Sequence, residues 1–344
     1  MGAHDQHERR TTVLAARLLC AMSHPRATLH RVSEHARRAC RWRAGKLTWA
    51  VKISAPNDET AARWGDMAFA EDLADALRAA GQTVRIDRLG APPAPATDVT
   101  LVLRGLHRID PTPDSVNLLW IISHPDDVSD AEALQAWDAV FVASRAYPRG
   151  DAWGARPLLQ ASSLRRFSPA PADPGLAEEV LFVGTTRGVD RPVVRDVIAA
   201  GARVGIYGHG WEEVVDPSLI RADHLAFDRV PTAYRSAGIV LNDHWDDMRA
   251  NGFVSNRLFD AAFAGARIIS DPVAGASEIF GGLVQTYSTP EELAALLRGA
   301  GWPSDAERLA LAARVRAHHS FDARASVLIE AARAARISSR RLRT

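Results

Sequence analysis

The chain has 344 residues, a length that allows two domains and a large buried core. Hydrophobic residues make up 47% of the sequence and charged residues 24%, which is ordinary for a globular protein. The net charge of +1 gives no argument for a nucleic-acid partner, and neither an apolar run of membrane length nor a secretory leader is found. The two cysteines, Cys20 and Cys40, lack metal-ligand spacing. We therefore expect a cytoplasmic protein with free thiols and no transmembrane segment.

Residues 1–46 form a basic extension, with ten Arg and Lys residues against three Asp and Glu residues. Apolar residues at helical spacing predict one helix before Pro25 and a second over Leu29–Trp42. We expect a helical extension with a solvated basic face; peripheral contact with an acidic acceptor or an anionic membrane surface is the alternative. The segment 320–344 is similar, with a long helix predicted over Ala323–Ala335 and a disordered end. Its basic residues after the last acid are Arg333, Arg336, Arg340, Arg341 and Arg343.

Residues 47–168 are predicted to form a first α/β domain. One helix ends near Gly81 and another covers Ala131–Trp137, and short apolar segments typical of buried strands surround them. This alternation predicts a mostly parallel sheet covered on both faces. The predicted strands are Leu47–Ile53, Val84–Ile86, Val99–Leu103, Asn117–Ile122 and Ala139–Ala143.

A Pro-rich linker, residues 169–176, separates this domain from a second one over residues 177–319. The second domain shows the same alternation and is therefore also predicted to be Rossmann-like. Its predicted strands are Val180–Val183, Val204–Tyr207, Ile239–Leu241 and Arg267–Ser270. Its predicted helices are Val193–Ala200, Asn256–Gly265, Pro290–Leu297 and Asp305–His318.

The helix that starts at Asn256 carries the strongest chemical signal. Ser255 or Asn256 can cap it, and Arg257 lies in its first turn. Free N–H groups and the helix dipole at such a start make an anion site. Asp260, one turn further, can accept two hydrogen bonds from a ribose diol; a purely local capping role is the alternative.

Loops after predicted strands supply the other candidates, because ligands of doubly wound sheets bind there. In the loop after Val183, Gly184 permits close backbone approach, and Arg187 and Arg191 carry charge that matches phosphate oxygens. The alternative is that both arginines are solvated loop residues, and of the two we favour Arg187.

Three residues of the first domain are candidates for the general base of an acceptor hydroxyl. They are Asp66, His124 and Asp126. A structural turn role is the alternative for His124. The acidic cluster Asp243–Asp247 matches no specific metal site, so we expect no metal.

The stretch from Asn251 to Ser270 resembles the donor-binding signature of GT-B glycosyltransferases. Many of these enzymes carry a Glu, then seven residues that begin with a Gly-Phe pair, and a second Glu before an Ala-Gly and a strand. Asn251 and Gly252 occupy the front of this motif, and Asp260 takes the second acid's place one residue late. The longer string resembles most closely the subgroup related to the spore-maturation protein CgeB.

This resemblance implies two Rossmann-like domains that face each other across a cleft, and a metal-independent glycosyltransferase of hexosyltransferase type (EC 2.4) without a cofactor. The donor would be a UDP-, GDP- or TDP-linked sugar, and the acceptor a small molecule, glycan or protein. Gly184, Arg187, Arg191, Gly252, Ser255, Asn256 and Arg257 would hold the donor, with Asp260 on its ribose. A nucleotide-sugar 2-epimerase and a non-catalytic donor-binding subunit are the alternatives.

Overall fold

The computed structural model describes residues 25–189 and 191–341. The chain divides into two compact units, Met1–Leu47 and Thr48–Thr344. In the first unit, helix α2 (Pro25–Ala44) confirms the second predicted N-terminal helix and carries Arg41 and Arg43 in its last turn, where cations favour the helix dipole. The helix predicted before Pro25, and Cys20 within it, lie outside the described residues.

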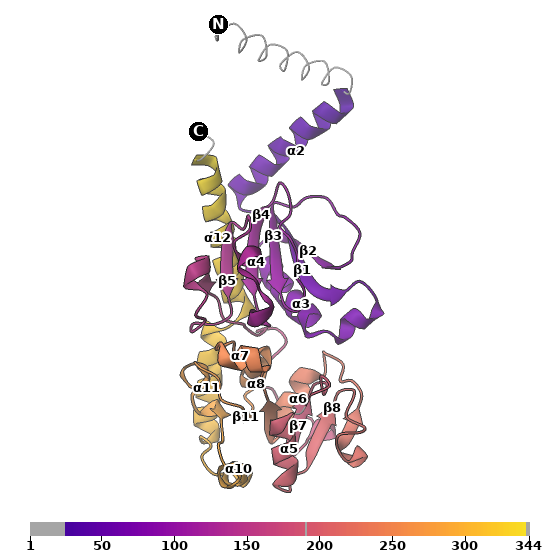
Figure 1. The fold of residues 1–344 in the computed structure, drawn as a ribbon, viewed down its shortest axis with the longest axis vertical. Coiled ribbons are helices and arrows are strands. Elements are labelled where there is room, and N and C mark those ends of the chain that lie inside the picture. Colours follow the sequence, from indigo (N-terminus) through magenta and orange to yellow (C-terminus); the bar gives the residue numbers. More distant parts are fainter. Residues whose placement is uncertain (1–24, 190, 342–344) are drawn as a thin grey trace, which may run out of the picture. The chain divides into compact units, whose positions relative to one another are not determined.

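The second unit contains two six-stranded sheets, and both are entirely parallel (Figure 1). The order of the first is β2-β1-β3-β4-β5-β6. Parallel strands buried on both faces explain why these segments are continuous apolar runs. The strands are β1 (Thr48–Pro56), β2 (Thr83–Leu89), β3 (Val99–Arg104), β4 (Val116–Ile121), β5 (Ala139–Val142) and β6 (Arg156–Pro157).

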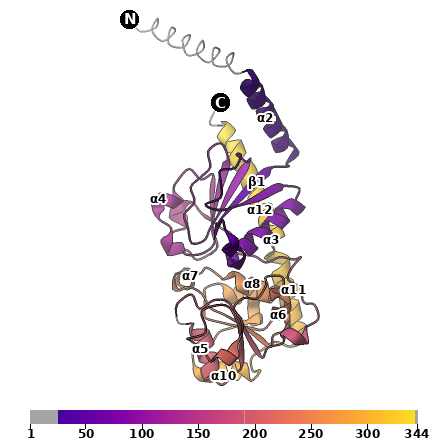
Figure 2. The same cartoon turned by 90° about the vertical axis from the view of Figure 1, so that its right-hand side faces the viewer.

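Helix α3 (Gly65–Ala79) packs on β1 and β2, and the C-terminal helix α12 (Phe321–Arg341) packs beside it on β4 and β5 (Figure 2). Phe69 of α3 lies edge-on to Phe321 and to Trp120, with ring centroids 4.7 and 5.4 Å apart. The chain therefore returns to its first sheet. Helix α12 continues beyond the predicted end at Ala335 to Arg341, and the last three residues, at which a disordered end is predicted, lie outside the described residues.

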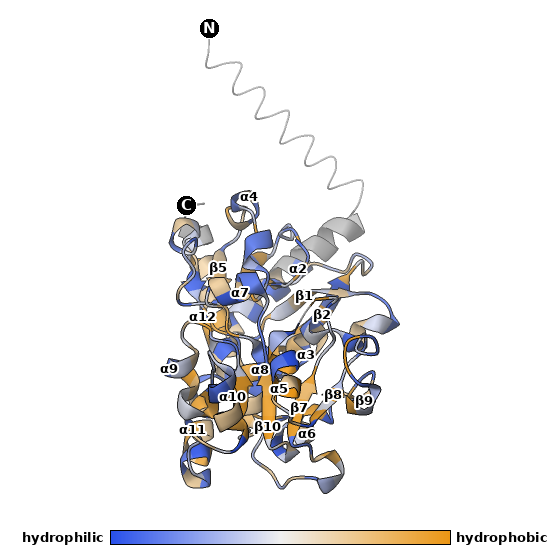
Figure 3. Ribbon diagram, turned by 60° about the horizontal axis from the view of Figure 1, so that its bottom comes forward, coloured by the Kyte–Doolittle hydropathy of each residue, from blue (hydrophilic) through white to orange (hydrophobic). Residues whose placement is uncertain are grey.

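The second sheet has the order β12-β11-β10-β7-β8-β9. Apolar clusters cover its two faces, one around α6 and α8 and the other around α5 and α10. Figure 3 shows the strands near β7 as a hydrophobic strip. The strands are β7 (Val180–Val183), β8 (Val204–Tyr207), β9 (Ile220–Ala222), β10 (Ile239–Asn242), β11 (Ile268–Ser270) and β12 (Val284–Gln285). The helices are α5 (Pro192–Ala199), α6 (Val230–Ser236), α7 (Asp246–Ala250), α8 (Asn256–Phe263), α9 (Ala276–Phe280), α10 (Pro290–Leu297) and α11 (Asp305–His318).

Two segments that connect the sheets, one between β6 and β7 and one between α11 and α12, pair with each other at Ser162. Its N–H donates to His319 O (3.1 Å), and its carbonyl accepts from Phe321 N (3.0 Å), forming a parallel bridge with Ser320. Arg324 of α12 fixes the same crossing, because its guanidinium donates to the carbonyls of Leu159 and Gln160 at 2.7 and 3.0 Å.

The sequence analysis missed several short elements. Strands β6, β9 and β12 and helices α6, α7 and α9 have at most seven residues each, too few for a clear apolar period. The helix predicted over Ala131–Trp137 is only a single turn, α4 (Asp130–Ala133). In the described part of the chain, no helix is both long and apolar enough to cross a membrane.

Candidate active site

A cavity of about 470 Å³ opens at the carboxyl ends of strands from both sheets. Its walls come from the start of α3, the loops after β4, β7, β8 and β10, and the start of α8. This is the place at which doubly wound sheets bind ligands. Most residues singled out in the sequence lie in this lining: Asp66, His124, Gly184, Arg187, Arg191, Ser255, Asn256, Arg257 and Asp260.

Two of the predicted residues, Asp126 and Gly252, do not belong to the described lining. Asp126 Oδ1 instead accepts a hydrogen bond from Asn251 Nδ2 at 3.0 Å. Gly252 has a φ of 68°, and a Cβ there would lie 3.1 Å from Ser144 Oγ. That hydroxyl donates to Asn251 O at 2.7 Å. Asn251, at the place of the first acid in the motif that the sequence resembles, thus ties the second half of the chain to loops of the first.

The start of α8 offers several groups to an anion. Ser255 is the N-cap, but its hydroxyl makes no capping hydrogen bond. Among the residues that the structure describes, the backbone N–H groups of Asn256 and Arg257 find no acceptor. The Ser255 N–H differs, since it donates to His244 Nε2 at 3.0 Å. One hydroxyl and two amides therefore remain for a ligand.

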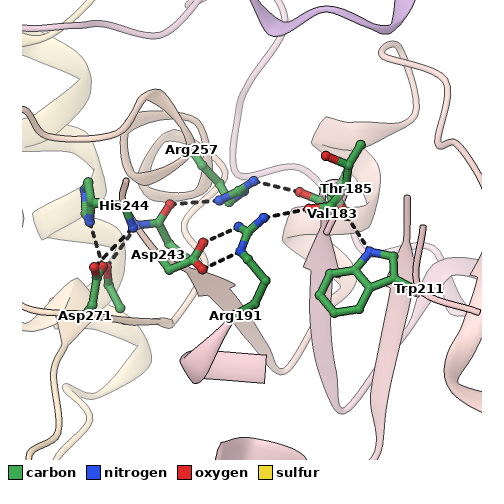
Figure 4. Close-up of polar contacts among 11 residues, drawn as sticks. Val183, Thr185, Arg191, Trp211, Asp243, His244, Arg257 and Asp271 are labelled. Carbon is green, nitrogen blue, oxygen red and sulfur yellow. Dashed lines mark hydrogen bonds and ion pairs between the residues drawn. The ribbon is translucent and has the colours of Figure 1, made fainter. Parts of the chain in front are cut away.

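Arg191 and Arg257 are fixed by hydrogen bonds beneath the cavity (Figure 4). Arg191 is 3% exposed, forms a two-pronged ion pair with Asp243 and donates to Thr185 O at 2.6 Å. Arg257 donates to Asn242 Oδ1 at 3.0 Å and to Val183 O at 2.9 Å. Much of the charge of Arg191 is already balanced by Asp243, so Arg191 can contribute less electrostatic stabilisation to an anionic ligand.

Arg187 differs from both. Its residue adopts the left-handed backbone conformation, with a φ of 60°, and its guanidinium lies 4.4 Å from the centre of the Trp245 ring. It has no hydrogen-bond or ion-pair partner within residues 25–189 and 191–341. Burial, with the nearby charges of Arg191 and Arg257, lowers the pKa of Arg187 to about 9, so it is still a cation at neutral pH. It is the arginine best placed to accept a new anionic partner.

Asp260 is buried at the edge of the cavity, with 7% of its surface exposed. Its Oδ1 accepts from Ser162 Oγ at 2.6 Å and its Oδ2 from Asn256 Nδ2 at 2.9 Å. Burial raises the pKa of Asp260 to about 8, although the hydrogen bonds from Ser162 and Asn256 oppose this shift. The carboxyl group points back along α8 as expected, and each oxygen retains capacity for a further hydrogen bond.

His244 and Asp271 form a pair that the sequence analysis did not assign to the site (Figure 4). His244 Nδ1 lies 2.6 Å from Asp271 Oδ1, and His244 N donates to Asp271 Oδ2 at 3.1 Å. Although burial opposes it, the hydrogen bond from His244 lowers the pKa of Asp271. Asp271 directly follows β11 and His244 lies two residues after the end of β10, and this strand-end position is the signal that could have identified them.

Two of the proposed bases lie on the opposite wall. Asp66, in the first turn of α3, is half-buried, and burial raises its pKa to about 6 against a hydrogen bond from the Ser54 backbone. His124 has a left-handed backbone, with a φ of 50°, and its Nδ1 lies 3.0 Å from Ser123 Oγ. Burial lowers the pKa of His124, which favours the neutral imidazole. Both groups can therefore accept a proton near neutral pH.

Glycines allow the loops of the second sheet to approach closely. A Cβ at Gly184 would lie 2.9 Å from Arg257 Nη2, and one at Gly208 would lie 2.1 Å from the Gly184 carbonyl oxygen. Trp211 Nε1 donates to that same oxygen at 2.8 Å. The loops after β7 and β8 are consequently held together as one wall of the cavity.

Two of the acidic residues after β10 form ion pairs. Asp243 binds Arg191, and Asp246 binds Arg249 at 2.7 Å. Over the described residues, no group of three or more His, Cys, Asp or Glu side chains is arranged to hold a metal ion.

Comparison with known proteins gives matches in family and fold. Residues 190–330 match a family described as "Glycosyl transferase-like". A search of curated proteins returned no match. Among solved structures, AviGT4, a glycosyltransferase involved in avilamycin A biosynthesis, is similar with a TM-score of 0.58 and 19% identity, covering 84% of this chain and 97% of its own.

Two further structures with bound nucleotide are similar over comparable lengths. HepE of Anabaena, in complex with UDP-glucose, has a TM-score of 0.53 and 13% identity, covering 85% of this chain and 100% of its own. T4 phage BGT, in complex with UDP and Mn²⁺, has a TM-score of 0.55 and 11% identity, covering 83% and 99%. The two parallel sheets and these neighbours confirm the predicted fold class: this chain has the GT-B glycosyltransferase fold, and its residues 190–330 match the glycosyl transferase-like family.

Proposed function

We propose that this chain is a metal-independent glycosyltransferase of hexosyltransferase type, which moves a sugar from a nucleotide-diphospho-sugar to an acceptor hydroxyl. The observation that carries the proposal is the meeting, in one cavity, of Arg187, the first amides of α8 and the half-buried Asp66. Among residues 25–189 and 191–341, neither the Arg187 guanidinium nor the N–H groups of Asn256 and Arg257 have a hydrogen-bond partner. The family match and the fold support it. A CgeB-like subgroup and a cytoplasmic location remain part of the proposal.

On the donor side, the diphosphate would lie against the start of α8. The Ser255 hydroxyl and the amides of Asn256 and Arg257 would bind its oxygens, and Arg187 would leave Trp245 to pair with it. Asp260 would accept hydrogen bonds from the ribose. Arg191 and Gly184 would shape the wall behind the phosphates. Because neighbours of this fold hold UDP or UDP-glucose, a uridine nucleotide is the first donor to test.

On the acceptor side, Asp66 or His124 would take the proton of the attacking hydroxyl. The hydroxyl oxygen would bond to the anomeric carbon while the bond from that carbon to the terminal phosphate oxygen breaks. The charge that develops on the departing diphosphate would be stabilised by Arg187 and by the amides of α8. Asp126 is bound to Asn251, so it is the weakest of the three candidates.

The test begins with thermal shift and titration calorimetry against UDP, GDP, TDP and CDP. We expect one diphosphate to stabilise the protein, and the corresponding sugar nucleotide to be turned over equally with and without EDTA. Isomerisation of the donor alone would indicate an epimerase, and binding without transfer to any acceptor a non-catalytic subunit. Failure of all four diphosphates to bind would sink the proposal.

A further inference from the structure

The imidazole of His244 occupies an unusual position between two parts of the site. Its side chain is fully buried, yet the residue lies in the cavity lining. Nδ1 faces the Asp271 carboxylate at 2.6 Å, and Nε2 faces the Ser255 N–H at 3.0 Å. Because an N–H can only donate, Nε2 must be the unprotonated nitrogen, and the proton lies on Nδ1 toward Asp271.

This arrangement replaces the ordinary cap of α8. An N-cap serine usually turns its hydroxyl inward to accept an amide of the first turn. Ser255 makes no such bond, and in the described part of the chain its hydroxyl has no other partner. Its backbone is held instead through its own N–H, by His244. The hydroxyl and the next two amides are thereby left available on the cavity side.

The support behind the imidazole is itself anchored. Asp271 Oδ1 also accepts from Ser270 Oγ at 3.1 Å, and Asn242 Nδ2 donates to Ser270 Oγ at 2.9 Å. Asn242 Oδ1 in turn accepts from Arg257 at 3.0 Å. The chain of contacts thus begins and ends on the first residues of α8 and passes through the ends of β10 and β11.

We propose that His244 is a positioning residue of the diphosphate site: its Nε2, held in the acceptor tautomer by Asp271, fixes Ser255 so that the Ser255 hydroxyl and the following amides receive phosphate oxygens. The inference rests on the proposed donor site. It assigns to His244 no contact with the reacting atoms. It predicts that the acceptor at the Nε2 position, and not the imidazole ring as such, is what the site requires.

Two substitutions of His244 test the roles of its two ring nitrogens separately. His244→Gln places an amide oxygen near the Nε2 position and can still accept the Ser255 N–H. His244→Asn reaches only the Nδ1 position, so it can contact Asp271 but leaves Ser255 unheld. Asp271→Asn is the second route, because it removes the carboxylate that keeps the proton on Nδ1. His318→Asn, at an exposed histidine on α11, is the matched control.

The experiment measures dissociation constants of UDP and uridine by calorimetry on the full chain, with melting temperatures to show that each variant folds. We expect UDP affinity to fall about tenfold in His244→Asn and Asp271→Asn, and to stay within about twofold of the parent in His244→Gln and His318→Asn. Uridine affinity should be unchanged in all four.

Equal UDP affinities in His244→Gln and His244→Asn would overturn the inference while leaving the donor site intact. An equal loss for uridine and UDP would also overturn it, because the defect would then not concern the diphosphate. If the parent protein binds none of the four nucleoside diphosphates, the proposed function itself fails, and this inference with it. Should His244→Asn not fold, Asp271→Asn decides the question alone.

Discussion

The guanidinium of Arg187 lies over the Trp245 ring, 4.4 Å from its centre, while Arg191, four residues on, forms a buried ion pair with Asp243. A cation over an aromatic face is stabilised by about 0.5 to 2 kcal/mol. A charge-assisted hydrogen bond to a phosphate oxygen can replace this interaction. A buried ion pair resists such exchange, because removal of one partner strands the other charge. The two arginines of this loop are consequently expected to behave differently when substituted.

Arg187→Ala should weaken UDP binding by about tenfold to a hundredfold, because one charge-assisted hydrogen-bond partner of the diphosphate is lost. Uridine binding and the melting temperature should change little. Arg191→Ala should instead lower the free energy of unfolding by about 3 to 5 kcal/mol, since it leaves Asp243 buried and unpaired. Calorimetry measures the nucleotide affinities of the two variants and urea denaturation their stability. Arg249→Ala, at an exposed residue of α7, is the control. Equal losses of UDP and uridine affinity in Arg187→Ala would refute its assignment.

The ionisation of Asp260 should be visible in the pH dependence of stability. Its pKa is raised in the folded protein to about 8 from 3.8, so the folded state binds a proton that the unfolded state releases. The stability contributed by this proton is complete below pH 4 and is lost as the pH rises through about 8. Asp260→Asn cannot titrate, so its melting temperature should fall less between pH 5 and 8 than that of the parent. Parallel profiles would show that Asp260 is ionised in the folded protein.

Asp66→Asn should lower kcat by about a hundredfold to ten-thousandfold, with little change in KM for the donor, if Asp66 is the base. Since the pKa of Asp66 is raised to about 6, the rate of the parent should increase as the pH rises through 6, where the carboxylate forms. The pH–rate profile of sugar transfer, or of donor hydrolysis, measures this. His124→Asn is the variant for comparison. A greater loss of kcat in His124→Asn than in Asp66→Asn would identify His124 as the base.

Arg324 should be a major determinant of stability, although it is not itself among the described residues of the cavity lining. It is 7% exposed and donates to the carbonyls of Leu159, Gln160 and His318. Arg324→Met keeps the packing volume but leaves these carbonyls without their donor, and should cost about 2 to 4 kcal/mol of unfolding free energy. Urea denaturation measures the cost, with exposed Arg333→Met as the control. A loss no greater than that of the control would contradict the interpretation.

Much of the fold could be predicted because its long elements have clear periods. The strands β3, β4, β7 and β8 and the helices α10 and α11 lie where the apolar pattern places them. The short helices α7 and α9 follow no such pattern and depend on tertiary contacts for their stability, so the sequence alone did not reveal them.

The site was predictable in its location more than in its bonding. Most residues of the lining could be identified from the loops that follow predicted strands, because parallel strands bring their carboxyl ends together. The sequence analysis favoured Arg187 over Arg191, but it could not foresee the buried ion pair of Arg191, since the partner Asp243 lies 52 residues away. The hydrogen bond between Ser162 and Asp260 spans 98 residues and equally leaves no local signature.

The position of Ser162 has a consequence for how the protein would bind its donor. Its main chain forms a bridge with Ser320 that joins the two connections between the sheets, and its hydroxyl donates to the Asp260 carboxyl group, the proposed ribose ligand. A nucleotide that engages Asp260 must share or displace this hydroxyl. Binding of the donor and the arrangement of the two connections between the sheets are thereby linked through one oxygen atom, the Ser162 hydroxyl.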